Sequence, residues 1–318
     1  MSSLPATSAV ASSSSSSSSS STTTTIKVDP VMPLTGMPIT DPKLATRAAV
    51  VVKVGNYDAH PQRGTNQADL VYEEIINANV SRFAMVFQTQ TAPEVGPIRS
   101  GRRQDVNLFG SLNRPIFAWA GGNRTVTQEI QSSDLIDLSQ FKCQGSCFRG
   151  GGDFMPYNLF FNVDKVYTLS LPDAGTPPQQ FQYLQTGETA AGRDSVGVDL
   201  KMDSYRVTWT WNPTTQLYER TQNGRPDKNW DGSLVTTNNV VVLEMVYNPG
   251  ISGSPDAVSV GHGNVYVFTG GKVVKGQWTR ADRKAVFTLT TDSGDPIKLT
   301  PGRTFIELPR TGGNVTAK

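Results

Sequence analysis

Residues 48–54 read Ala-Ala-Val-Val-Val-Lys-Val and open with an apolar run of five residues. A short run of this kind predicts a buried strand. Two further runs, Arg82–Gln88 and Ile116–Ala120, have the same character, whereas Arg102–Leu112 and Thr125–Ser132 favour helices. Strands that alternate with helices are typical of an α/β domain.

Outward from these runs, the chain divides into four predicted segments. Residues 1–32 form a disordered Ser/Thr-rich tether, because they lack the apolar side chains that would offset about 1–2 kcal/mol of ordering entropy per residue. Residues 33–172 form the α/β amino-terminal domain, and residues 173–204 form a linker. Short β-rich runs separated by turn residues then predict a smaller, mainly antiparallel β domain over residues 205–310.

One turn of the β domain has a clear sequence signature. Gly270-Gly271 lies between Tyr266-Val267-Phe268-Thr269 and Lys272-Val273-Val274. Two glycines can both adopt the positive φ angles that a two-residue hairpin turn requires. The sequence therefore predicts a tight hairpin at this point.

Composition excludes several classes of protein. The 318 residues carry 29 Lys and Arg against 27 Asp and Glu, a net charge of +2, which argues against nucleic acid as a partner. Two histidines, His60 and His262, and two cysteines, Cys143 and Cys147, cannot assemble a common zinc site. We predict no cofactor and no bound metal, and any anion site must be local.

The two cysteines have two possible states. Cys143 and Cys147 are separated by three residues, which is not the usual spacing of a redox motif. If the protein is exported, they form a small disulfide loop. If it is cytoplasmic, they are two free thiols.

The stretch Arg99-Ser100-Gly101-Arg102-Arg103 is the strongest candidate for a binding site. Ser100 is placed as the N-cap of a following helix, so arginine side chains and free backbone N–H groups would meet at one helix start. Such a site suits a phosphate, pyrophosphate or carboxylate. The alternative is a purely structural network, in which the arginines pair with nearby carboxylates of Asp69, Glu73, Glu74 and Asp105.

Asp69 and Glu73 form a second polar pair. In a helix their spacing of four residues would place them on one face, and in a strand they would also share a face. Two carboxylates can act as general acid and base or hold a hard cation. The alternative is that they are ordinary structural acids.

Many motifs in one order resemble those of the YerB-like bacterial lipoproteins, a two-domain family of unknown function. The amino-terminal motifs are Asn66-Gln67-Ala68-Asp69-Leu70-Val71-Tyr72-Glu73, Gly96-Pro97-Ile98-Arg99-Ser100, Trp119-Ala120-Gly121-Gly122-Asn123 and Asn158-Leu159. The carboxy-terminal motifs are Asn239-Val240-Val241-Val242, Gly270-Gly271-Lys272-Val273 and Leu299-Thr300-Pro301-Gly302-Arg303-Thr304. The resemblance covers residues 33–309.

The resemblance implies a lipid-anchored protein on the outer face of the cytoplasmic membrane, and it implies no accepted reaction. Members of the family usually carry His where this chain has Tyr157, which argues against a mechanism that needs that histidine. The polar residues that remain as ligand-binding candidates are Arg99, Ser100, Arg102, Asp69, Glu73, Arg149 and Asn158.

Three functional hypotheses follow. The first is an extracytoplasmic, membrane-tethered envelope protein that binds a phosphorylated or anionic envelope ligand at Arg99 and Arg102, with Asp69 and Glu73 shaping the pocket. Its membrane contact would run only through the Ser/Thr-rich tether, whose lipid-modified cysteine is missing from this sequence. The second is an envelope phosphoryl or glycosyl transferase in which Asp69 or Glu73 acts as base or holds Mg²⁺.

The third hypothesis is a scaffold for an envelope protein, with exposed tryptophans as anchors. The candidates are Trp209, Trp211, Trp230 and Trp278. Met1–Ala11 lack the basic start and apolar stretch of a signal peptide, so this segment does not itself show export. Export is predicted instead from the tether and the resemblance. A cytoplasmic protein with a disordered tail is the alternative.

Overall fold

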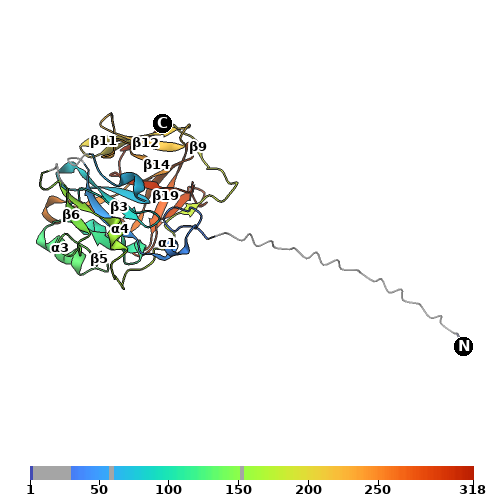
Figure 1. Cartoon of the computed structure of the whole chain (residues 1–318). Coiled ribbons are helices and arrows are strands. Elements are labelled where there is room, and N and C mark those ends of the chain that lie inside the picture. The colour runs from blue at the N-terminus through green and yellow to red at the C-terminus, as the bar shows by residue number, and fades with distance from the viewer. Residues whose placement is uncertain (3–29, 57–60, 151–153) are drawn as a thin grey trace.

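The computed structural model describes residues 1–2, 30–56, 61–150 and 154–318. The predicted tether over residues 1–32 therefore lies mostly outside the described residues, as does His60. Strands predominate in the described part of the chain, and its longest helix, α3 (Arg124–Gln131), has eight residues (Figure 1). In that part, every helix falls short of the length and apolarity needed to cross a membrane.

An 11-stranded sheet forms the centre of the molecule and draws on both predicted domains. Its strand order is β20 (Thr288–Thr291), β19 (Lys272–Arg280), β18 (Gly261–Thr269), β15 (Asn239–Leu243), β22 (Thr304–Leu308), β2 (Leu70–Ile75), β3 (Ser81–Phe87), β1 (Val50–Gly55), β4 (Ile116–Ala118) and β5 (Ile136–Asp137), with β9 (Arg193–Asp194) paired to β19.

The pairing of β2 with β22 joins the two halves of this sheet. The two strands are parallel, in a register that runs from Leu70↔Thr304 to Glu74↔Leu308. On its other edge β2 pairs with β3, and on its other edge β22 pairs with β15. Both strands of the junction therefore lie in the interior of the sheet. The predicted amino- and carboxy-terminal domains thus share one continuous sheet.

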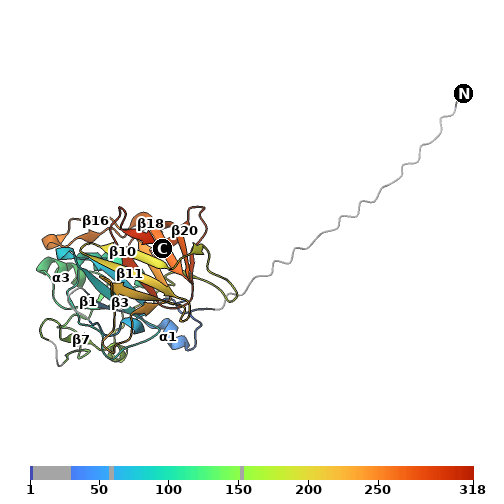
Figure 2. The same cartoon turned by 90° about the horizontal axis from the view of Figure 1, so that it is seen from above.

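A second, six-stranded sheet packs over part of the first. Its order is β13 (Arg225–Pro226), β12 (Leu217–Gln222), β11 (Tyr205–Asn212), β10 (Gly197–Met202) and β23 (Val315–Ala317), with β14 (Thr236–Thr237) paired to β12. Figure 1 shows β11 and β12 at the top of the molecule, and Figure 2 shows β10 and β11 in the layer that faces the viewer from above.

The remaining elements are short. The small sheets pair β16 (Tyr247–Asn248) with β17 (Asp256–Ala257), β21 (Lys298–Leu299) with β8 (Gln182–Tyr183), and β6 (Cys147–Arg149) with β7 (Leu159–Phe161). The helical segments are α1 (Pro42–Thr46), α2 (Arg103–Leu108), α4 (Val163–Val166) and the 3₁₀ turns η1 (Thr65–Gln67), η2 (Asn77–Asn79), η3 (Gly110–Leu112) and η4 (Ile251–Gly253).

Strand alternation gives the large sheet two apolar faces. One face packs against the second sheet, where the Trp209 ring of β11 lies 4.8 Å from the Phe305 ring, and Phe305 in turn contacts Phe83 edge to face. The opposite face, with Val51 and Tyr72, packs against helical residues that include Leu108, Phe109 and Ile130. The large sheet is therefore the middle layer of three.

Several sequence-based predictions are confirmed. β1, β3 and β4 occupy the three predicted buried runs with shifts of one or two residues at their ends. The hairpin between β18 and β19 has Gly270 and Gly271 at φ 55° and 74°, with Thr269 paired to Lys272.

The α/β description of residues 33–172 overestimates the helices. The predicted helix Arg102–Leu112 divides into α2 and η3 at Phe109. Gly110 sits so close to the Arg283 backbone that a Cβ there would lie 2.3 Å from the Arg283 carbonyl oxygen. The predicted linker, residues 173–204, contributes the strands β8, β9 and β10.

The tryptophans proposed as partner anchors are mostly internal. Trp209 and Trp278 are 0% and 2% exposed, and Trp211 is partly buried against Tyr218. Trp230, at 54% exposed, remains the one of the four that presents a large surface.

We predict that Trp209→Ala lowers the free energy of unfolding by about 3–5 kcal/mol, because it opens a cavity between the sheets. It also removes the hydrogen bond that Trp209 Nε1 donates to Glu307 Oε1 at 2.7 Å. Chemical denaturation measures the loss. Phe141→Ala, at a side chain that is 90% exposed, serves as the control and should change stability by less than about 0.5 kcal/mol. Equal effects of the two substitutions would contradict the packing described above.

Candidate functional site

The segment that carries Arg99 runs beside the end of β1. The Arg99 N–H donates to the Lys53 carbonyl at 2.8 Å, and the Arg99 carbonyl accepts from the Ala120 N–H at 2.9 Å. Ile98 forms a bridge with Val54 in the same strand. These bonds fix the backbone of residues 98–99 against the sheet and place the following arginines next to Lys53.

Arg102, rather than Ser100, caps helix α2. The Arg102 N–H donates to Asp105 Oδ2 at 2.6 Å, in a capping box in which Asp105 is the third helical residue. Its guanidinium donates to the Gly101 carbonyl at 2.9 Å and to Asn77 Oδ1 at 2.7 Å. The prediction that Ser100 is the N-cap is wrong, because helix α2 begins at Arg103, two residues later than expected.

Ser100 contributes its backbone instead. Its carbonyl accepts a hydrogen bond of 2.6 Å from Arg82 Nη1, which reaches across from β3. Arg82, Arg99 and Arg102 therefore gather at one end of the sheet, and we call these three residues the arginine cluster. Arg103, in contrast, points away and lies 3.4 Å from Glu129 on α3.

Lys53 lies beneath the arginine cluster and is fully buried. It forms ion pairs with Glu74 and, at 2.7 Å, with Asp105. Burial lowers the pKa of Lys53 to about 8; Asp105 opposes this shift, while Arg82 and Arg102 add to it. Burial also lowers the pKa of Arg102, with Asp105 opposing and Arg99 adding to the shift. Positive charges are thus held close enough to destabilise one another.

Tyr157, Arg149 and Asn158 lie beside the cluster. The Arg99 guanidinium carbon is 4.9 Å from the centre of the Tyr157 ring. Arg149 Nη1 donates to Asn158 Oδ1 at 2.6 Å across the β6–β7 hairpin. That hairpin is joined to the arginine segment by the hydrogen bond from Ile98 N–H to the Leu159 carbonyl, at 2.7 Å. The structure therefore brings five predicted residues to one region: Arg99, Ser100, Arg102, Arg149 and Asn158.

Asp69 is not part of that region. It precedes β2, is fully buried, and its Oδ2 accepts from the N–H groups of Gln88 and Thr89 at 2.5 and 2.6 Å. Burial raises the pKa of Asp69 to about 6 despite these two hydrogen bonds. Asp69 and Glu73 are four residues apart in nearly extended chain, which separates their Cα atoms by about 13 Å. The two carboxylates therefore cannot bind the same ligand atom.

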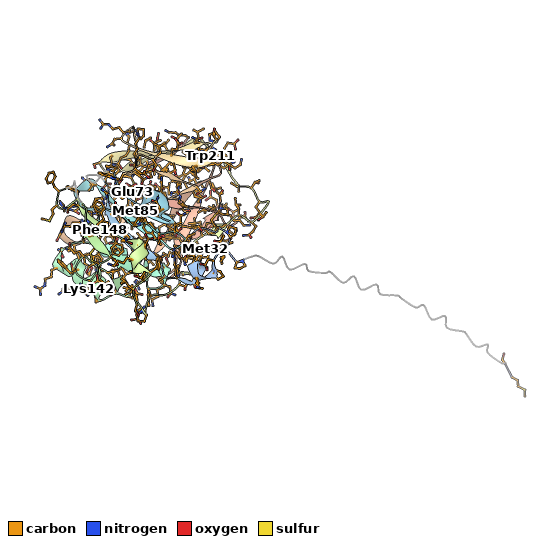
Figure 3. The ribbon with its side chains drawn as sticks, viewed as in Figure 1. Met32, Glu73, Met85, Lys142, Phe148 and Trp211 are labelled. Atoms are coloured by element: carbon orange, nitrogen blue, oxygen red, sulfur yellow. A yellow bond between two sulfur atoms is a disulfide. The ribbon has the colours of Figure 1, made fainter. Side chains whose placement is uncertain are left out.

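Glu73 lies between the two sheets and on the face of the large sheet opposite to Lys53. Glu73, which is labelled in Figure 3, is fully buried. Its Oε1 accepts from the side chains of Asn56, Ser81 and Tyr205 at 2.6–2.8 Å. Its Oε2 accepts from Arg220 Nη2 at 2.6 Å. Because both oxygens are engaged by protein groups and the side chain is 0% exposed, the structure does not present Glu73 to an external substrate.

Arg220 and Glu307 complete this buried network. Arg220 also pairs with Asp227, and although burial opposes it, Glu73 and Asp227 raise the pKa of Arg220 above its ordinary value. Burial, and then the adjacent Glu73, raise the pKa of Glu307 well above its usual range. Glu307 therefore favours its protonated form, and Arg220 pairs with the side chains of Glu73 and Asp227.

Sequence reasoning missed Lys53, Arg82, Arg220 and Glu307. A signal was present for two of them. Lys53 interrupts an otherwise apolar strand, which implies a buried partner for its charge. In the run Leu217–Thr221, strand alternation places Arg220 on the same face as Tyr218, which is the buried face.

The described residues contain no group of three or more His, Cys, Asp or Glu side chains that could hold a metal ion. A cavity of about 440 Å³ lies elsewhere, beside Arg114, Pro177 and Lys284, and the arginine cluster does not line it. The chemistry that the cluster can perform is recognition of an anion by guanidinium groups.

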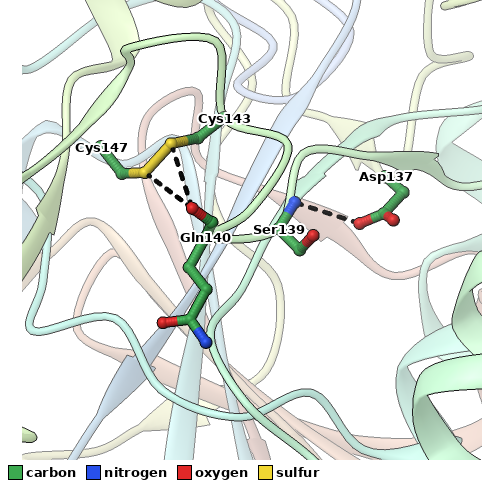
Figure 4. Close-up of a disulfide and its surroundings, with 5 residues drawn as sticks. All are labelled: Asp137, Ser139, Gln140, Cys143 and Cys147. Carbon is green, nitrogen blue, oxygen red and sulfur yellow. Dashed lines mark hydrogen bonds between the residues drawn. A yellow bond between two sulfur atoms is a disulfide. The ribbon is translucent and has the colours of Figure 1, made fainter.

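Cys143 and Cys147 are joined by a disulfide, which closes a small loop just before β6 (Figure 4). Both sulfur atoms lie 3.6 Å from the Gln140 carbonyl oxygen. Of the two states left open by the sequence, the structure has the oxidised one.

Comparison with known families finds matches over most of the chain. The N-terminal domain of a family described as a protein of unknown function (DUF3048) matches residues 34–177, and the C-terminal domain of the same family matches residues 196–306. The candidate lipoprotein YerB of Bacillus subtilis strain 168 is 25% identical over 286 residues, which cover 87% of this chain and 85% of that protein.

The crystal structure of YerB from Bacillus subtilis has the same fold. It superposes with a TM-score of 0.80 at 22% sequence identity and covers 91% of this chain and 100% of the YerB chain. The predicted resemblance to the YerB-like family is confirmed.

Replacing the buried Arg220 by Met should lower the free energy of unfolding by about 3–5 kcal/mol, because it leaves Glu73 and Asp227 buried without a cation. Urea denaturation measures the change. The exposed Arg225, on the neighbouring strand β13, provides the matched control, and Arg225→Met should have little effect. A loss below about 1 kcal/mol for Arg220→Met would show that the network is not a strong constraint.

Asp69 should make stability depend on pH. Between its unfolded pKa of about 4 and its folded pKa of about 6, the folded chain keeps a proton that the unfolded chain has lost. The stability contributed by this group therefore falls by roughly 3 kcal/mol as pH rises from 4 to 6. Asp69→Asn should abolish that part of the pH dependence. A constant difference in unfolding free energy between wild type and Asp69→Asn across this range would refute the raised pKa.

Proposed function

We propose that this chain, which belongs to the DUF3048 family, is an exported, membrane-tethered protein that binds an anionic ligand of the cell envelope. The observation that carries the proposal is the arginine cluster, in which Arg82, Arg99 and Arg102 converge above the buried Lys53. The relevant ligand groups are phosphate, pyrophosphate and carboxylate.

Two features support an extracytoplasmic location. The relative YerB is named as a candidate lipoprotein, and lipoproteins are anchored to a membrane by their lipid. The disulfide between Cys143 and Cys147 is of a kind that persists in oxidising compartments and is rare in the cytosol. The Ser/Thr-rich sequence of residues 6–25 would then link the membrane to the folded part.

The energetic argument for an anion rests on the repulsion among like charges. Beyond the effect of burial, Arg99 lowers the pKa of Arg102, and Arg82 and Arg102 lower the pKa of Lys53, so neighbouring positive charges destabilise the charged forms of Lys53 and Arg102. A bound anion would relieve this repulsion, and guanidinium groups can bind its oxygens in pairs. Helix α2, with six residues, is too short to contribute much through its dipole.

The proposed site comprises Arg99, Ser100 and Arg102, with Arg149 and Asn158 on the adjacent hairpin. Asp69 and Glu73 are excluded from it, because each is buried among other partners. For the same reason the geometry does not favour the transferase hypothesis, in which one of these two carboxylates acts as base or as a Mg²⁺ ligand.

A thermal-shift comparison tests the proposal. Wild-type protein is heated with and without pyrophosphate, alongside Arg102→Ala, Arg99→Ala and the control Arg103→Ala. At pyrophosphate about 100-fold above Kd, binding adds about 2.7 kcal/mol, which should raise the wild-type midpoint by about 5–11 °C. Arg103→Ala should retain the shift, since Arg103 pairs with Glu129 outside the cluster.

Loss of the shift in Arg99→Ala and Arg102→Ala, in proteins that remain folded without ligand, would support the anion site. If the shift persists in both variants, the anion binds elsewhere. If these variants unfold while wild type shows no shift with pyrophosphate, the arginines hold the fold together and do not recognise a ligand.

A further inference from the structure

Trp230 lies on a turn whose backbone is firmly held. Its N–H donates to the Gln62 carbonyl at 2.9 Å, which ties the turn to the amino-terminal half of the chain. Within the turn, Asn229 N–H donates to the Ser233 carbonyl and Gly232 N–H donates to the Asn229 carbonyl, both at 2.9 Å. The residue is nevertheless 54% exposed. A large apolar ring is thus kept at the surface by a rigid support.

One face of the indole is already occupied. The Arg63 guanidinium lies 4.2 Å from the centre of the Trp230 ring and 4.3 Å from that of Phe160, which is only 2% exposed. Arg63 also pairs with the Glu94 carboxylate, which fixes the guanidinium between the two rings. Because the inner face of Trp230 is covered, its exposed area belongs mainly to the outer face and the edges. These contacts fix the orientation of the indole ring before any ligand binds, and its outer face is a flat surface.

The next residue supplies an oriented acceptor. The side chain of Asp231 is exposed, and its Oδ1 accepts from Ser233 N–H at 2.9 Å and from Ser233 Oγ at 2.6 Å. Both bonds go to Oδ1, so the carboxylate is anchored while Oδ2 keeps acceptor capacity. A carboxylate accepts strong hydrogen bonds from hydroxyl groups and repels anions.

We propose that Trp230 and Asp231 form a binding site for a neutral saccharide. The C–H groups on one face of a pyranose ring would stack on the outer face of the indole, and two of its hydroxyl groups would donate to Asp231. Small-molecule sites combine aromatic side chains with a small number of placed polar groups, which is the chemistry that Trp230 and Asp231 offer. The ligand differs in charge from the one proposed for the arginine cluster, so the two sites can be tested separately.

Isothermal titration calorimetry with two neutral tetrasaccharides, chitotetraose and maltotetraose, tests the site. We expect wild type to bind at least one of them. Trp230→Ala should weaken that binding by about tenfold or more, whereas Trp230→Phe, which keeps an aromatic face, should weaken it by less than about fivefold. Asp231→Ala should also weaken binding, because the hydroxyl groups lose their acceptor.

Two control variants test whether the loss of binding is specific to Trp230 and Asp231. Phe154→Ala removes an aromatic side chain that is 86% exposed on another loop and should leave saccharide affinity unchanged. Arg103→Ala, at a side chain outside both proposed sites, should also leave it unchanged. The thermal midpoints of the Trp230 and Asp231 variants should stay within about 4 °C of wild type, since both side chains are exposed.

The proposal is overturned if wild type binds neither tetrasaccharide at roughly 10 mM, which is weaker than any useful recognition. It is also overturned if Trp230→Ala binds as tightly as wild type. In either case the exposed Trp230–Arg63 stack would fit a contact with another protein better, since Trp and Arg are enriched at such contacts.

Discussion

The parallel pairing of β2 with β22 is the constraint on which the rest of the structure depends. It brings residues 70–74 next to residues 304–308, more than 200 positions along the chain. Once this pair forms, β3 and β1 extend the sheet on one side, while β15, β18 and β19 extend it on the other. Closing so long a loop costs entropy that only extensive burial can offset. Both faces of the large sheet are accordingly covered, one by the second sheet and one by α2 and α3.

The same pairing creates the buried ionic network. Glu73 and Glu307 are directly opposite each other in the β2–β22 register, on the face that meets the second sheet. Burial and the adjacent Glu73 both raise the pKa of Glu307, which favours its protonated form. Arg220 from the second sheet pairs with Glu73. The network therefore links the two sheets, because Arg220 and Trp209 of the second sheet bond to Glu73 and Glu307 of the first.

The opposite face of the sheet has a different electrostatic character. There Lys53, Arg82, Arg99 and Arg102 are gathered with two nearby carboxylates, Glu74 and Asp105, which bind Lys53. Asp69 and Glu73, which the sequence suggested as parts of the ligand pocket, are instead buried among partners of their own. The proposed anion site would work through guanidinium groups and backbone position, whereas the buried carboxylates stabilise the fold.

The sequence by itself determined the local elements. The apolar runs around Val51, Val86 and Phe117 predicted β1, β3 and β4, and Gly270-Gly271 predicted the hairpin, because periodicity and turn chemistry act over a few residues. It also indicated the family and the grouping of Arg99 with Arg102. Only the tertiary structure decided that the two halves share one sheet, and that Glu73 faces Arg220 rather than Asp69. Such contacts depend on which distant strands pair, and strand pairing is selected by the combined burial of both partners, which no local pattern contains.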